Sequence, residues 1–350
     1  MQVNFGRDSN TQKPLIWNSD SVVNGHVMLV GMSGSGKTHF IRKIIRTMLP
    51  QAADIADFKV HVFDVHEDID LGSDGISEVQ FSESADYGMN PLIINPDPDY
   101  GGVRKTIANF INTINKTSHK LGSRQEPLVR RLLEDLYAAN GYFADQPESW
   151  YSNQLYGGKQ KKVPTLKDLH RWGKYQLKKT MTGADSRCAA NLETLNASVR
   201  KFRKSLKENA TESESQLSQL IEKHKQDLCN NFSTYVHSIN TGNELDDIIK
   251  YSDKNRLESV LDAIENLMAT GIFKAGIPPF NPNEPIHRYR IKPFTEDERK
   301  LFVLFRLRNI FRRALSTGLK DYIDTVIVLD EAHIYIDDDE ENIVNIISKE

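Results

Sequence analysis

Cysteine is scarce in this chain of 350 residues, which contains only Cys188 and Cys229. Two cysteines are too few for a disulfide framework, and neither has the CxxC or Cys/His spacing of a metal site. We therefore expect two buried thiols in a reducing compartment.

Long apolar runs are also missing. No run approaches the roughly 20 residues that a helix needs to cross a bilayer, and Met1–Arg7 lacks the basic-then-apolar pattern of a signal peptide. These absences predict a cytoplasmic protein with no membrane partner.

An excess of charge of either sign is absent as well. The formal net charge is −3, with 39% hydrophobic and 27% charged residues, which is ordinary for a globular protein. Charge therefore neither supports nor excludes nucleic-acid binding, because clustered side chains could still form a local basic face.

What the chain does contain is a glycine-rich octapeptide, Gly31-Met32-Ser33-Gly34-Ser35-Gly36-Lys37-Thr38. It fits the P-loop pattern of Gly, four residues and Gly-Lys-Thr. The preceding residues 26–30 read as a short buried strand, and residues 40–45 continue as an amphipathic helix. Strand, glycine loop and helix in this order predict a nucleoside triphosphate site.

The residue types match what such a site requires. Glycines let the backbone N–H groups approach phosphate oxygens, Lys37 can reach the β- and γ-phosphates, and the Thr38 hydroxyl is placed to ligate Mg²⁺. The predicted nucleotide-binding residues are Gly31, Ser33, Gly34, Ser35, Gly36, Lys37, Thr38 and His39.

A second motif lies near the end of the sequence, where Thr325–Leu329 reads as a buried strand that ends in Asp330-Glu331. This is the Walker B pattern. Asp330 is predicted to hold Mg²⁺, and Glu331 to orient or deprotonate the attacking water, so that Glu331 and Lys37 are the catalytic candidates. Alone the pattern is common by chance, but its pairing with the P-loop makes it specific.

Other segments are predicted from their patterns. A hairpin is expected within residues 1–25, and Lys59–Val65 reads as a strand that leads into Asp64-Val65-His66-Glu67-Asp68. Asp64, His66 or Glu67 could face the γ-phosphate or the lytic water, or all three could belong to a solvated strand-end turn. Both interpretations stay open.

Helical patterns dominate the middle of the chain. Apolar stripes in residues 128–136 and 257–268 predict core helices, residues 208–225 read as a mobile segment or a projecting helical hairpin, and a strand at 287–291 precedes a helix from Glu296 to about Leu315. Two basic clusters, a loop at 159–162 and residues 200–204 at the opening of a charged helix, could contact phosphates. A solvated surface is the favoured interpretation of each.

Together these motifs resemble the HerA/FtsK group of P-loop motor ATPases, and the HerA-like branch in particular. The resemblance rests on residues 31–38, on Phe63–Glu67 as a variant of that branch's Asp-x-His-Gly-Glu strand end, on Asn90-Pro91-Leu92, and on Leu329–His333. It implies an α/β fold, with a RecA-like αβα core, a mainly parallel sheet and a large helical insertion. It also implies ATP and Mg²⁺ as cofactors, double-stranded DNA in the pore of a homo-oligomeric ring, commonly a hexamer, and a nuclease or other effector as partner.

The expected organisation has three parts. Residues 1–100 would form the first part of the ATPase core, 101–285 a helical insertion, and 286–350 the return to the core. We expect the core to be incomplete at its C-terminal end, because the resemblance implies further strands after the second motif. The glycine of the strand-end pattern is replaced, which leaves the role of Glu67 open.

The leading hypothesis is an ATP-driven DNA translocase or helicase subunit, in DNA processing or antiphage defence. The alternatives are a nucleotide-dependent scaffold or switch that recruits an effector, and a secretion- or conjugation-type ATPase. The sequence lacks both a Leu-Ser-Gly-Gly-Gln-like signature and an Asn-Lys-x-Asp motif, which argues against ABC-type ATPases, small GTPases and kinases.

Overall fold

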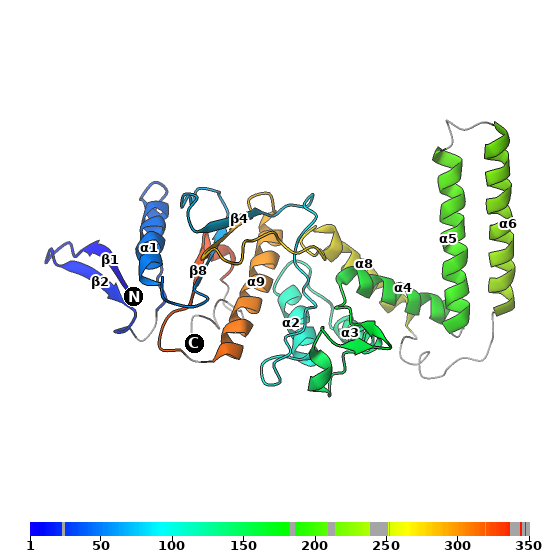
Figure 1. Ribbon diagram of the computed structural model, residues 1–350, viewed down its shortest axis with the longest axis horizontal. Coiled ribbons are helices and arrows are strands. Elements are labelled where there is room, and N and C mark those ends of the chain that lie inside the picture. Colours follow the sequence, from blue (N-terminus) through cyan, green and yellow to red (C-terminus); the bar gives the residue numbers. More distant parts are fainter. Residues whose placement is uncertain are drawn as a thin grey trace. The chain divides into compact units, whose positions relative to one another are not determined.

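A computed structural model describes residues 1–22, 25–182, 186–208, 214–238, 251, 253–318, 320–336, 344 and 347 (Figure 1). Contacts divide the chain into two compact units. One comprises residues 1–121, 137–166 and 266–350, and the other comprises residues 122–136 and 167–265.

The first unit is built on a parallel sheet of four strands in the order β4-β7-β3-β8. The strands are β3 (Lys59–Asp64), β4 (Ile76–Gln80), β7 (Ile286–Arg290) and β8 (Thr325–Leu329). The predicted strands at 59–65, 287–291 and 325–329 are confirmed, whereas β4 was not predicted. Parallel neighbours require crossover connections, which the long helical segments between them supply.

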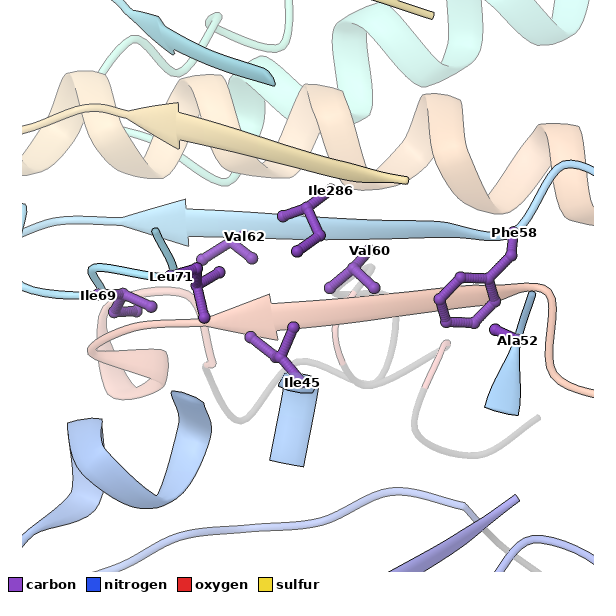
Figure 2. Close-up of a cluster of buried hydrophobic side chains, with 8 residues drawn as sticks. All are labelled: Ile45, Ala52, Phe58, Val60, Val62, Ile69, Leu71 and Ile286. Carbon is purple, nitrogen blue, oxygen red and sulfur yellow. The ribbon is translucent and has the colours of Figure 1, made fainter. Parts of the chain in front are cut away.

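One face of the sheet packs against α1 (Lys37–Gln51), the helix that follows the P-loop. Side chains alternate along a strand, so Val60 and Val62 of β3 point to this face, where they meet Ile45 of α1 (Figure 2). The buried cluster on this face comprises Ile45, Ala52, Phe58, Val60, Val62, Ile69, Leu71 and Ile286.

The other face carries aromatic side chains that pack against α9 (Glu296–Thr317). Phe302 of α9 lies 4.6 Å from the ring of Phe81 and 6.1 Å from that of Tyr289, measured between centroids. A capping box formed by Thr295 and Glu298 starts the helix. The predicted crossover helix is therefore confirmed, and α2 (Val103–Asn115) packs on it through Phe110 and Phe305.

The predicted N-terminal hairpin is also confirmed. Strands β1 (Gln2–Arg7) and β2 (Pro14–Asn18) pair antiparallel. The ring of Phe5 stacks on Trp17 and meets the edge of Phe40 in α1, so the hairpin lies beside the helix that begins at the P-loop.

The buried strand predicted at residues 26–30 is wrong. These residues form no strand, and the side chains of Met28 and Val30 are both 81% exposed. A strand is stabilised by a hydrogen-bonded neighbour, and within the described residues no strand pairs with this segment. For the same reason β8 is half-buried rather than buried: within the described part of the chain it has a partner, β3, on one side only.

The second unit is helical. It contains most of α3 (Glu126–Ala139) and α8 (Lys254–Ala269), together with α4 (Leu166–Thr182), α5 (Ser186–Glu208) and α6 (Glu214–Ser238). The predicted apolar stripes are confirmed as core, with Leu132 and Leu257 fully buried. Gly173 allows close packing, since a Cβ there would lie 2.6 Å from the side chain of Leu261. No helix among the described residues is long and apolar enough to cross a membrane.

Helices α5 and α6 lie side by side as a hairpin (Figure 1), which confirms the hairpin interpretation of 208–225; residues 209–213 lie outside the described part. The basic cluster at 200–204 lies well inside α5 and does not open a helix. Cys229 is exposed on α6, so its predicted burial is wrong. The side chain of Cys188 lies outside the described residues.

The remaining short elements belong to the first unit. They are the 3₁₀ helices η1 (Pro147–Trp150) and η2 (Ala332–Ile334), and the two-residue strands β5 (Leu155–Tyr156) and β6 (Lys159–Gln160), which pair antiparallel. The basic segment at 159–162 is thus partly a hairpin strand rather than a loop.

Candidate functional site

The glycine loop folds tightly because two of its glycines adopt left-handed backbone angles. Gly34 has φ 78° and Gly36, the residue that caps α1, has φ 89°, a region that side chains other than glycine rarely occupy. At Gly31 the constraint is space, since a Cβ would lie 2.5 Å from the Ser35 hydroxyl oxygen. The loop therefore leaves its backbone open to an approaching phosphate.

Lys37 is the first residue of α1 and folds back over this loop. Its Nζ donates hydrogen bonds to the carbonyl oxygens of Gly31 at 2.7 Å and Met32 at 3.0 Å. The ammonium group is thus held above the loop, where it can exchange these carbonyl oxygens for phosphate oxygens. The adjoining residue His39 is exposed on the same helix.

Thr38, next along the helix, points toward the carboxyl ends of the strands. Its Oγ1 donates a hydrogen bond to Oδ2 of Asp68 at 3.2 Å. The carboxylates of Asp64, Asp68 and Asp330 each offer an oxygen within 4.8 Å of the others. The P-loop helix and the ends of β3 and β8 therefore converge on one cluster of oxygen ligands, to which Asp68 belongs although the sequence did not indicate it.

The adjacency of β3 and β8 explains how the acids meet. Phe63 pairs with Leu329 in parallel register, and the N–H of Asp330 donates to the carbonyl of Phe63 at 3.2 Å. In return, Oδ2 of Asp330 accepts from the N–H of Val65 at 3.3 Å. The end of β3 thus binds Asp330, the residue after β8, and Asp330 in turn binds Val65, the residue after β3.

Asp64 is fully buried and is occupied by structural bonds. Its carboxylate accepts from Nε and Nη2 of Arg288 at 2.9 and 2.6 Å, and from the N–H groups of Glu67 and Ile69 at 2.7 and 3.2 Å. The guanidinium group compensates its charge. Asp64 therefore braces the turn after β3, and Asp68 and Asp330 are the acids that remain for a cation.

Glu67 turns away from this cluster. It has φ 63°, and its carboxylate accepts from Arg290 Nη2 at 3.1 Å. Of the three candidates in the turn, Glu67 and Asp64 form ion pairs with arginines of β7, and only His66 faces the second motif.

Glu331 is held by two histidines. Its Oε1 lies 3.2 Å from His66 Nε2, and its Oε2 lies 3.2 Å from His333 Nδ1. The carboxylate is 37% exposed, and the residue has a left-handed φ of 52° at the start of η2. Glu331 is thus oriented on both oxygens while it remains open to solvent.

Burial is the largest influence on Asp330 and raises its pKa above the usual value for an aspartate. His66 and the N–H of Val65 act in the opposite direction, and the charges of Asp64 and Asp68 add to the rise. Carboxylates and a hydroxyl are the hard oxygen ligands that Mg²⁺ prefers, so this donor set fits the cation.

Other predicted positions have structural partners. Asn90 donates to the carbonyl of Pro164 at 2.9 Å. Lys161 donates to the carbonyl of Ser149 and lies over the ring of Tyr142, at 5.3 Å from the centroid, so this lysine of the segment at 159–162 is engaged internally.

Comparison with known proteins finds a family similarity in the first part of the chain. Residues 3–140 match the family described as Helicase HerA, central domain. The matched segment contains the P-loop and the turn after β3, so this part of the chain is similar to that family.

Two further proteins are similar to this chain. The DNA import protein CedB of Sulfolobus acidocaldarius is 31% identical over 146 residues, which are 39% of this chain and 22% of CedB. The match thus spans less than a quarter of that relative's length. The solved structure of VirB4 from Thermoanaerobacter pseudethanolicus superimposes with a TM-score of 0.54 at 13% identity, over 96% of this chain and 69% of the other, which shows a shared RecA-like fold.

Proposed function

We propose that this chain is the nucleotide-binding part of an ATP-hydrolysing DNA translocase or helicase subunit. The observation that carries the proposal is the contact of Thr38, in the P-loop helix, with Asp68 beside Asp330. It brings the phosphate-binding loop, the acids of both strand ends and Glu331 together at the carboxyl ends of the strands. Open α/β sheets bind their ligands at this end.

The roles follow from the contacts. Lys37 leaves the carbonyl oxygens of Gly31 and Met32 to bind the phosphates of ATP. Thr38 and Asp330 would hold Mg²⁺, and the Thr38 hydroxyl orients the Asp68 carboxylate. When bound, Mg²⁺ neutralises charge on the phosphate oxygens.

Glu331 acts on the attacking water. Because His66 and His333 hold its two oxygens, the carboxylate is oriented before ATP arrives. A preoriented acceptor of this kind fits the task of positioning water or removing its proton.

DNA is the proposed molecule on which this ATPase acts. Support comes from the similarity to a DNA import protein and to the central domain of the HerA helicase. As in the resemblance stated above, we propose a homo-oligomeric ring, with six subunits as the first expectation, and an effector such as a nuclease in DNA processing or antiphage defence.

A second candidate is an ATPase that moves DNA across a membrane as part of a conjugation- or secretion-type machine. The similarity to CedB, whose name states DNA import, favours this candidate. The two candidates share the chemistry and differ in the partner.

The test is steady-state ATP hydrolysis by the full-length protein with and without duplex DNA. Lys37→Ala should abolish turnover, whereas Lys43→Ala, which removes an exposed lysine from the same helix, should not. Turnover should also rise with DNA. Equal turnover by Lys37→Ala and the wild type would refute the P-loop assignment, and turnover indifferent to DNA would favour a scaffold or switch.

A further inference from the structure

The middle of the chain departs from the charge balance of the whole. Residues 166–204 contain ten Lys and Arg but only three Asp and Glu, a net charge of +7, whereas the complete chain has a net charge of −3. Basic residues are therefore concentrated on α4 and α5 of the helical unit.

The basic residues of α4 form a stripe on one face of the helix. Lys167, Arg171, Lys174 and Lys178 follow one another at four-, three- and four-residue spacing, which places them above one another. The buried residues of α4 are Leu166, Leu169, Gly173 and Gln176, which lie on the opposite face. The buried side of α4 thus packs in the core, and its solvent-facing side carries the positive charge.

The stripe continues from α4 onto α5 through a shared acid. Lys178 of α4 forms an ion pair with Glu193 of α5, and Nη2 of Arg200 lies 3.9 Å from the other oxygen of the same carboxylate. Arg200 lies seven residues after Glu193, and Lys204 lies four residues after Arg200, so both share the face of Glu193 on α5. Arg171 and Arg200 are 69% and 75% exposed.

Among the described residues, three acids beside the stripe each have a cationic or histidine partner. Asp168 lies 3.5 Å from Arg171, Glu265 of α8 lies 3.5 Å from His170, and Glu193 is shared as described. They leave a net positive surface. At about 1.5 Å rise per residue, the 11 steps from Lys167 to Lys178 cover about 16 Å, which equals the rise of about five base pairs of duplex DNA.

We propose that this basic stripe, made of Lys167, Arg171, Lys174, Lys178, Arg200 and Lys204, binds the phosphate backbone of duplex DNA. The proposal extends the function given above, since it names the surface on which DNA lies. A bilayer would require apolar side chains beside the charges, but the apolar face of α4 is buried. Contacts to phosphates need no base recognition, so binding should be independent of DNA sequence.

The test compares two triple variants of the full-length protein that remove equal charge. The stripe variant is Arg171→Gln, Lys174→Gln, Arg200→Gln. The control variant is Lys223→Gln, Lys254→Gln, Arg256→Gln, whose residues lie on α6 and α8 of the same unit. Affinity for a fluorescent 30-base-pair duplex is measured by anisotropy between 50 and 300 mM salt, and thermal unfolding confirms that both variants are folded.

Removal of three phosphate contacts should reduce the slope of log affinity against log salt by about 2.7, and the control should keep the wild-type slope. An unchanged slope in the stripe variant would refute the proposal, as would loss of binding to anionic phosphatidylglycerol vesicles with DNA affinity intact. A wild type that binds DNA but hydrolyses no ATP would contradict the proposed function alone. A wild type that binds no DNA would overturn both.

Discussion

Asp68 offers a sharp test of the site because its proposed role depends on a single contact. Its Oδ2 accepts from the Thr38 hydroxyl at 3.2 Å, and its carboxylate lies within 4.8 Å of those of Asp64 and Asp330. Asp68→Asn removes the negative charge while the side chain keeps its size. The substitution should therefore weaken the cation site without disturbing the fold.

The expected loss of Mg²⁺ affinity follows from the effect of comparable side chains in other metal sites. Residues that orient metal ligands cost about 10- to 100-fold in metal affinity when they are removed. Asp330 remains as a ligand, so the site should weaken without being lost. We expect the Mg²⁺ concentration for half-maximal ATP hydrolysis to rise by about 10- to 100-fold, with turnover largely restored at saturating Mg²⁺.

The assay titrates Mg²⁺ at constant ATP and follows both hydrolysis and the binding of a fluorescent ATP analogue. Asp70→Asn is the matched control: Asp70 is an exposed aspartate of the same loop that accepts from the N–H of Gly72 and lies outside the acid cluster. An Asp68→Asn protein with the wild-type Mg²⁺ midpoint would show that Thr38 and Asp330 suffice, and our assignment of Asp68 would be wrong.

Two further predictions concern Glu331 and His61. Glu331→Gln should retain ATP binding and lower turnover by about 10²- to 10⁴-fold, the usual contribution of a general base; a loss of ATP binding in an equilibrium assay would contradict its role in orienting water. His61 is buried beside Tyr289, and burial lowers its pKa from 6.5 to about 3. The unfolded chain therefore takes up a proton that the folded chain rejects, so the free energy of unfolding should fall by about 1.4 kcal/mol per pH unit as the pH drops from 6.5 toward 3. Urea unfolding at several pH values should show a shallower dependence for His61→Gln, and parallel curves for the two proteins would refute the argument.

Much of the site could be predicted because its signals are local. The spacing of Gly31, Gly34 and Gly36 reflects a loop whose geometry is set within eight residues. The strand that precedes Asp330 is likewise marked by a run of β-branched and aliphatic residues. Patterns of this kind depend little on the rest of the chain.

The segment at 26–30 shows where a local pattern fails. Its apolar residues suit a strand, yet Met28 and Val30 are exposed. Within the described residues, this segment pairs with no strand. The stability of a strand comes from hydrogen bonds and side-chain contacts with a neighbour, and sequence periodicity does not reveal whether that neighbour is present.

The sequence did not single out Asp68, because side-chain directions in a turn do not follow a periodic pattern. The HerA-type strand end has glycine where this chain has Glu67, and Glu67 indeed adopts a left-handed φ of 63°. That turn directs Glu67 to Arg290 and Asp68 to Thr38. We therefore propose that the acid of the pattern corresponds to Asp68 rather than to Glu67.

The same turn explains how β7 supports the site although none of its residues belongs to the acid cluster. Asp64 is fully buried, and Arg288 of β7 donates to it twice while Asp64 accepts two N–H groups of the turn. A buried carboxylate that lost its guanidinium partner would be strongly destabilised, so the turn keeps its shape only while β7 keeps its register beside β3. Asp68 belongs to that turn. The register of β7, which lies more than 200 residues away in sequence, therefore fixes the contact between Asp68 and Thr38.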